Sequence, residues 1–154
     1  MIKLQSSVLF VKDLAASRCF YADLLEQKVG MVHGEMIGFE SGFALWQFDD
    51  ESQRIFNQPC VDQQPEGCGT FELCFETGSL DAVWDRLEQS GIKIVHPIRE
   101  QPWGQRVFRV YDPDHHIVAV GEPFAVVPQR FLTQGMGVKD VSGRNFMPLK
   151  IIIF

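Results

Sequence analysis

The chain has 154 residues, of which 45% are hydrophobic and 22% charged, and its formal net charge is −6. This length and composition are typical of one globular domain. The acidic charge argues against nucleic acid or an anionic membrane surface as the main partner, because both select for clustered Lys and Arg. No apolar run approaches the roughly 18 residues of a membrane span, and the polar N-terminus is unlike a signal peptide. We therefore expect a cytoplasmic protein with reduced cysteines.

The first predicted elements are a short strand and a helix. Residues 7–11 form an apolar run that predicts a strand. Asp13 is expected to cap the helix that follows, in which apolar residues between positions 20 and 25 are spaced at i, i+4. Extended chain from Met36 to Phe48 comes next, interrupted by glycines that mark turns.

The same order of elements then occurs a second time. Residues 70–75 alternate in polarity, as a half-buried strand does. Ser79 is expected to cap a second helix, and residues 80–87 place apolar side chains at i, i+3, i+4 and i+7. Three further extended segments follow, at residues 92–95, 106–111 and 117–121. The sequence therefore predicts two copies of a strand-helix-three-strand unit.

This repeat predicts an α+β fold. The two units span about residues 3–50 and 68–122, and a polar connector at 49–67 joins them. Each unit has a mixed sheet that its helix covers on one face only, so the uncovered face must meet something apolar. Two such faces turned toward each other would form a cup, which is a common shape for a small-molecule site.

The end of the chain departs from the repeat. We expect a domain at residues 1–125 and a short helical C-terminal extension at 126–154. The extension is predicted to contain helices at 126–132 and 138–144, separated by the glycines of Gly135-Met136-Gly137. Two short helices around a glycine also resemble a helix-turn-helix, but no basic recognition face accompanies them.

Three motifs occur in order along the repeat: Val11-x-Asp13-Leu14-x-x-Ser17-x-x-Phe20-Tyr21-x-x-Leu24-Leu25, Pro102-Trp103-Gly104-Gln105-Arg106-Val107 and Asp112-Pro113-Asp114. Together they resemble the glyoxalase/bleomycin-resistance/dioxygenase (vicinal oxygen chelate) superfamily. The resemblance implies two βαβββ modules that form a cupped mixed sheet, and commonly a homodimer. One departure is His115, which stands where the family usually has Gly, so that a left-handed backbone there would be mildly strained.

The resemblance also implies where a metal would bind. The family's enzymes take ligands, usually His and Glu, from the first and last strands of each module. This chain has Ser6, Thr70 and Ala119 at three of these positions and at best Gln47 at the fourth. A divalent metal needs three or four protein donors, which one amide and two hydroxyls do not supply. We therefore expect no metal, no other cofactor and no catalytic residue.

The residues expected to bind a ligand are Phe10, Trp46, Phe48, Glu72, Trp103 and His115. Their rings suit a planar ligand, and an indole adds an N–H donor that can orient it. The Glu72 carboxylate is expected to face the cup and pair with a cationic ligand. His115 is expected at the mouth of the pocket. The alternative is that the rings are ordinary core, Glu72 an exposed edge residue and His115 a solvated turn residue.

Three functions remain open at this point. The first is a metal-free protein that sequesters a small planar or partly aromatic molecule, as bleomycin-resistance members of the family do. The second is a metal-dependent lyase, isomerase or dioxygenase with a non-standard site. The third is an interaction or regulatory module that acts through its C-terminal tail. The lack of metal-binding side chains at the family's positions favours the first function over the second, and the aromatic residues favour the first over the third.

Overall fold

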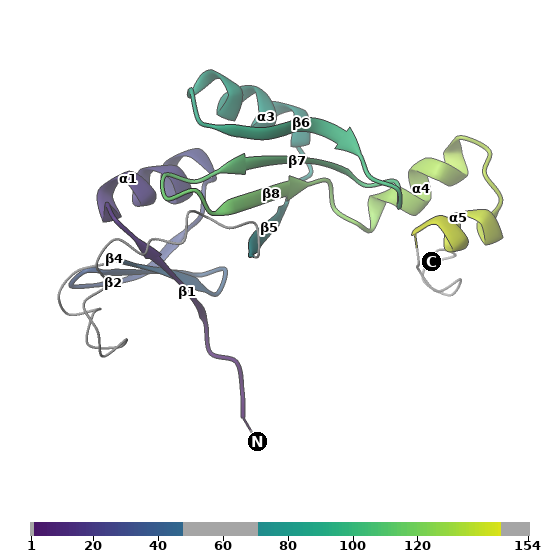
Figure 1. The fold of residues 1–154 in the computed structure, drawn as a ribbon. Helices are drawn as coiled ribbons and strands as arrows, with labels where there is room; N and C mark the ends of the chain where they lie inside the picture. Colours follow the sequence, from purple (N-terminus) through teal and green to yellow (C-terminus); the bar gives the residue numbers. More distant parts are fainter. Residues whose placement is uncertain (1, 48–70, 146–154) are drawn as a thin grey trace. The chain divides into compact units, whose positions relative to one another are not determined.

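The computed structural model describes residues 2–47 and 71–145 (Figure 1). The chain divides into two compact units: the first contains Met1–Phe71 and Asp112–His116, and the second contains Glu72–Tyr111 and Ile117–Phe154. The predicted connector at 49–67 lies outside the described residues, as do Phe48 and Thr70.

The first unit contains a four-stranded mixed sheet in the order β1-β4-β3-β2. Its strands are β1 (Ser7–Val11), β2 (Val29–His33), β3 (Met36–Phe39) and β4 (Phe43–Gln47). Strand β1 pairs with β4 in parallel, whereas the other neighbours are antiparallel. The extended segment predicted from Met36 thus corresponds to β3 and β4, and the sequence reading missed β2, which begins at Val29.

The helix of the first unit starts as predicted and then changes its geometry. The carboxylate of Asp13 accepts hydrogen bonds from the backbone N–H groups of Ala15 and Ala16 and so caps α1 (Leu14–Arg18). The chain continues as a π-helix, η1 (Cys19–Leu24), in which bonds span five residues rather than four. The helix predicted for this part is therefore present, as a π-helix rather than a regular α-helix.

The second unit repeats this arrangement with a sheet in the order β5-β8-β7-β6. Its strands are β5 (Glu72–Glu76), β6 (Ile94–Glu100), β7 (Arg106–Tyr111) and β8 (Ile117–Gly121). The first and last strands, β5 and β8, again pair in parallel. Two mixed sheets of the same topology confirm the predicted α+β fold with two βαβββ modules.

Each sheet carries one helix along one of its faces (Figure 1). In the second unit this helix is α3 (Leu80–Gln89), and its Trp84 ring packs edge-on against Phe108 of β7, with 5.2 Å between ring centroids. Ser79 occupies the N-cap position as predicted, but its side chain makes no capping hydrogen bond within the described residues. In both units, one sheet face is thus buried against the helix, and among residues 2–47 and 71–145 the helix of the unit lies on that face only.

The C-terminal extension forms the two short helices that the sequence predicted, α4 (Val126–Thr133) and α5 (Val138–Asn145). They pack together around Val127, Phe131 and Val141, which are buried. None of the helices in residues 2–47 and 71–145 is both long enough and apolar enough to cross a membrane.

Candidate functional site

The sheet of the first unit has one buried and one accessible face, because side chains alternate along each strand. Leu9 and Leu45, which are partners in the β1–β4 pairing, are buried on the helix side. Val8, between Ser7 and Leu9 on the same strand, points the other way and is 41% exposed. Phe10 and Trp46 are partners in the same register and are half-buried on this accessible side.

An aromatic stack lies on this accessible side. The rings of Phe10 and Trp46 are stacked with 5.9 Å between centroids and an interplanar angle of 28°. Met36 follows in the same row, as the partner of Trp46 on β3. Met31 lies across Gly38 and is 52% exposed. We call the set of Val8, Phe10, Met31, Met36 and Trp46 the aromatic face.

Two of the positions where the resemblance places metal ligands lie in the described part of the first unit. The Ser6 hydroxyl lies 3.2 Å from the carbonyl oxygens of Ser7 and Gly42, to which it can donate. The side-chain oxygen of Gln47 accepts from the N–H of Leu14, at 3.4 Å, at the start of α1. Both side chains are therefore bonded to backbone groups.

The second unit completes the test of a metal site. Ala119 offers only a methyl group, and within residues 2–47 and 71–145 no three His, Cys, Asp or Glu side chains are grouped so that they could hold a metal ion. The described donors at the predicted ligand positions therefore do not fit a divalent metal.

A row of side chains crosses the second sheet at Ala119. The strand register pairs His96 with Arg109, Arg109 with Ala119, and Ala119 with Cys74, so that four neighbouring strands each contribute one residue. The row lies on the sheet face opposite α3, because Phe108, next to Arg109, points to the helix. We call His96, Arg109, Ala119 and Cys74, with Glu72 beside them, the Arg109 row.

Charge in the Arg109 row is compensated internally. Arg109 donates from Nε to Oε2 of Glu72 at 2.6 Å and from Nη2 to Oε1 at 3.3 Å, and the Cys74 thiol also donates to Oε1. Hydrogen bonding by the Arg109 guanidinium holds the pKa of Glu72 below its usual range, so this carboxylate stays ionised. Burial, followed by the Glu72 carboxylate, raises the pKa of the Cys74 thiol. The carboxylate expected to meet a cationic ligand is thus already paired with an arginine.

The tautomer of His96 follows from its two neighbours. Its Nδ1 lies 2.7 Å from the carbonyl oxygen of Pro97, which can only accept, so Nδ1 carries the hydrogen. Its Nε2 then accepts from Nη1 of Arg109 at 3.1 Å. His96 therefore helps to orient the guanidinium. The sequence did not lead us to predict His96 or Arg109 as site residues. The only signal for Arg109 was that it is a charged residue between two apolar ones, Phe108 and Val110.

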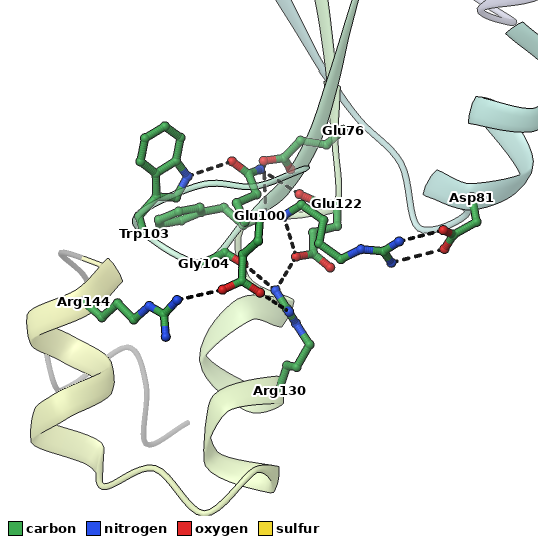
Figure 2. Close-up of polar contacts among 11 residues, drawn as sticks. Glu76, Asp81, Glu100, Trp103, Gly104, Glu122, Arg130 and Arg144 are labelled. Carbon is green, nitrogen blue, oxygen red and sulfur yellow. Dashed lines mark hydrogen bonds and ion pairs between the residues drawn. The ribbon is translucent and has the colours of Figure 1, made fainter. Parts of the chain in front are cut away.

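The loop that carries Trp103 is held by the C-terminal helices (Figure 2). The indole N–H of Trp103 donates to the side chain of Gln105 at 3.1 Å, so this donor is used inside the loop. Arg130 of α4 donates to the carbonyl oxygen of Gly104 and to the carboxylates of Glu100 and Glu122. The basic side chain of α4 thus contacts acidic groups of its own unit.

His115 and His116 have different environments. His115 is exposed and has the left-handed backbone expected for this turn, with φ 67°. His116 is half-buried, and its Nδ1 lies 2.8 Å from Oδ2 of the buried Asp112 carboxylate. The aspartate's hydrogen bond raises the pKa of His116. His116, which the sequence reading did not single out, therefore forms a close pair with a buried carboxylate.

Comparisons with known proteins agree with the fold. Residues 4–125 match the family model of the glyoxalase-like domain. A bleomycin resistance protein of Staphylococcus aureus is 27% identical over 125 residues, which cover 71% of this chain and 88% of that protein. A solved structure of a protein of unknown function from Agrobacterium tumefaciens is 33% identical, with a TM-score of 0.72, over 80% of this chain and 95% of that one. A glyoxalase/bleomycin resistance protein/dioxygenase from Nocardioides shares the fold at 23% identity, with a TM-score of 0.62, over 79% and 83%.

Proposed function

The chain belongs to the glyoxalase-like domain family of the glyoxalase/bleomycin-resistance/dioxygenase superfamily, and from this premise we propose that it binds a small planar, partly aromatic molecule without a metal. Binding of this kind needs no covalent chemistry. A toxic molecule such as an antibiotic would be neutralised by being held, one ligand for each binding site. The proposal includes the homodimer and the cytoplasmic location expected from the sequence.

The aromatic face is the observation that carries this proposal. Stacked rings and two methionines together give a flat, apolar surface with adaptable edges, which suits planar molecules of differing outline. A ring system that buried about 150 Å² of apolar surface there would gain about 4 kcal/mol from the hydrophobic effect. Affinity would then depend on ring area more than on polar contacts.

Two further observations support binding rather than catalysis. The described residues at the family's metal-ligand positions are Ser6, Gln47 and Ala119, a set that lacks strong donors for a Lewis-acidic ion. The similarity to a protein called a bleomycin resistance protein points to the same class of function. We therefore test bleomycin first, together with smaller flat aromatics.

The experiment is a titration of chelator-treated protein with bleomycin and with 2-naphthamide, followed by tryptophan fluorescence and calorimetry. We expect saturable binding in the absence of metal. Met31→Ala should weaken it several-fold, because it removes half of the flexible apolar edge. Val32→Ala is the matched control, since Val32 is next in sequence, 65% exposed and on the opposite face of β2.

Two outcomes would contradict the proposal. If binding appears only after zinc, nickel, manganese or iron is added, the protein belongs with the metal-dependent members of the superfamily. If Met31→Ala and Val32→Ala bind equally well, the ligand does not use the aromatic face. Light scattering of the same sample at several concentrations tests the homodimer.

A further inference from the structure

We propose that Arg109 forms an anion-accepting subsite in the second unit, which takes the oxyanion of a small planar acid such as an aromatic carboxylate. The subsite lies in the Arg109 row, where the resemblance would place a metal-ligating carboxylate at position 119. It is argued from the second unit alone and goes beyond the binding proposed for the aromatic face. The row in which the family's enzymes have a metal ligand thus contains the guanidinium of Arg109 and the methyl group of Ala119 in this chain.

The first step of the argument is the way in which Arg109 meets Glu72. A guanidinium can bind a carboxylate through its side, with Nε and one terminal nitrogen, or through its end, with both terminal nitrogens. Glu72 takes the side, because its oxygens accept from Nε and Nη2. His96 takes one hydrogen of Nη1. Three of the five N–H groups are therefore used by these two partners.

The second step concerns the donors that remain. Each terminal nitrogen of Arg109 keeps one N–H group with no acceptor among the described residues. Because Glu72 occupies the side of the guanidinium, the unused N–H of Nη2 points to its end, where Nη2 and Nη1 together can meet the two oxygens of a carboxylate. Ala119, the neighbour of Arg109 in the register, has no polar atom in its side chain that could compete for these N–H groups.

The third step is that the guanidinium is held in place before any ligand arrives. Contacts with Glu72 and His96 fix it from two sides, and Arg109 is only partly exposed. A preorganised donor pair loses little side-chain entropy on binding. Because Glu72 is a nearby anion, we expect the affinity for a simple carboxylate to be modest and to fall as salt rises.

Arg106 on the same strand provides an internal comparison. It also forms a two-point pair with a carboxylate, but Asp81 accepts from both terminal nitrogens, Nη1 at 3.2 Å and Nη2 at 2.6 Å. The end of this guanidinium is therefore occupied. Arg106, which has the same charge and lies three residues from Arg109, therefore offers a further carboxylate only the side of its guanidinium and not the end proposed for Arg109.

The test is a titration of the ¹⁵N-labelled wild-type protein with benzoate, observed at the arginine Nε–H resonances, with neutral benzamide as the matched probe. We expect benzoate to shift the Arg109 resonance in a saturable manner and by more than the Arg106 resonance, and benzamide to shift neither. Arg109→Lys should weaken benzoate binding about tenfold or more, because a lysine keeps the charge but loses the paired donors. Arg106→Lys should leave the binding unchanged.

The results that would overturn the inference are distinct from those that bear on the aromatic face. Equal shifts at Arg106 and Arg109 would show non-specific anion screening, and no shift at Arg109 would show a purely structural ion pair. Since the wild-type titration needs no variant, a failure of Arg109→Lys to fold leaves the test intact. Bleomycin or naphthamide binding can succeed or fail independently of this result.

Discussion

The hydroxyl of Tyr21 donates a hydrogen bond to Oδ2 of Asp112 at 2.8 Å, across 91 positions of the sequence. Both residues are buried, at 0% and 2% exposure. The other oxygen of Asp112 accepts from the backbone N–H groups of Asp114 and His116. Burial, followed by the charge of Asp112, raises the pKa of Tyr21, so that the phenol remains a donor. This contact ties the π-helical segment to the Asp-Pro-Asp turn within the first unit.

Tyr21→Phe should therefore destabilise the protein by about 1–3 kcal/mol, because a buried carboxylate loses one of its partners. The free energy of unfolding in urea measures this loss. Tyr21 and His116 both contact Oδ2 of Asp112, so a double-mutant cycle with His116→Gln measures the coupling energy between these two contacts. A change in the unfolding free energy of less than about 0.5 kcal/mol would show that water replaces the phenol without cost.

His116 should make stability depend on pH. Its pKa is raised in the folded protein by the hydrogen bond with Asp112, so the folded state holds the proton more tightly than the unfolded state. The resulting stabilisation is complete below the unfolded pKa of about 6.5 and is lost as pH rises through the folded pKa. The difference in unfolding free energy between wild type and His116→Gln should thus be larger near pH 6 than near pH 9. A difference independent of pH would contradict this assignment.

Gly104→Ala should be among the most damaging glycine substitutions in this chain. Gly104 has φ 92°, and a Cβ atom there would overlap the ring of Phe131 from α4. Gly135 is the matched control, since its φ is 88° and a Cβ would meet nothing within 4 Å. We expect Gly135→Ala to cost about 1 kcal/mol from backbone strain alone, and Gly104→Ala to cost roughly 1–3 kcal/mol more. Equal melting temperatures for the two variants would show that α4 moves away from the loop freely.

Arg130→Gln tests the contacts between the C-terminal helix and the Trp103 loop. Removing the guanidinium leaves Glu122 and the Gly104 carbonyl without this donor, so we expect a loss of about 1–3 kcal/mol and a change in Trp103 fluorescence. Arg144→Gln is the comparison and should cost less, because its ion pair with Glu100 is exposed and such pairs contribute less than about 1 kcal/mol, while its other contacts are the Phe131 ring and a long hydrogen bond to the Pro102 carbonyl oxygen. Unchanged fluorescence and stability in Arg130→Gln would mean that the loop keeps its conformation without α4.

The contacts of these arginines also bear on the helix-turn-helix interpretation. Arg130 pairs with Glu100 and Glu122, and Arg144 pairs with Glu100, so both basic side chains contact acidic groups of their own unit. A DNA-binding helix instead directs its basic groups to phosphates. The match to the family model ends at residue 125, and α4 and α5 follow it in the sequence. In the described residues, these two helices hold the Trp103 loop.

Local signals in the sequence were sufficient for much of the fold. Strands β1, β7 and β8 have the predicted bounds. The carboxylate of Asp13 caps α1, and that of Asp112 accepts a backbone N–H within its own turn, as Asp side chains commonly do at such positions. Strand alternation, an N-cap and an Asp turn each depend on a few neighbouring residues, so they can be read from sequence alone. Strand β2 gave no such signal, because its residues are mostly exposed and lack clear alternation.

Only the tertiary structure decided which of the candidate residues meet. Phe10 and Trp46 were each predicted to bind a ligand, but their stacking depends on the β1–β4 register. Glu72 was expected to await a cationic ligand, yet the order of strands brings it within 2.6 Å of Arg109, 37 positions away. Register and strand order are set by the summed packing of both sheet faces, which no local window of sequence contains. The sequence by itself thus determined the family and the modules, and packing determined the partners of each charge and ring.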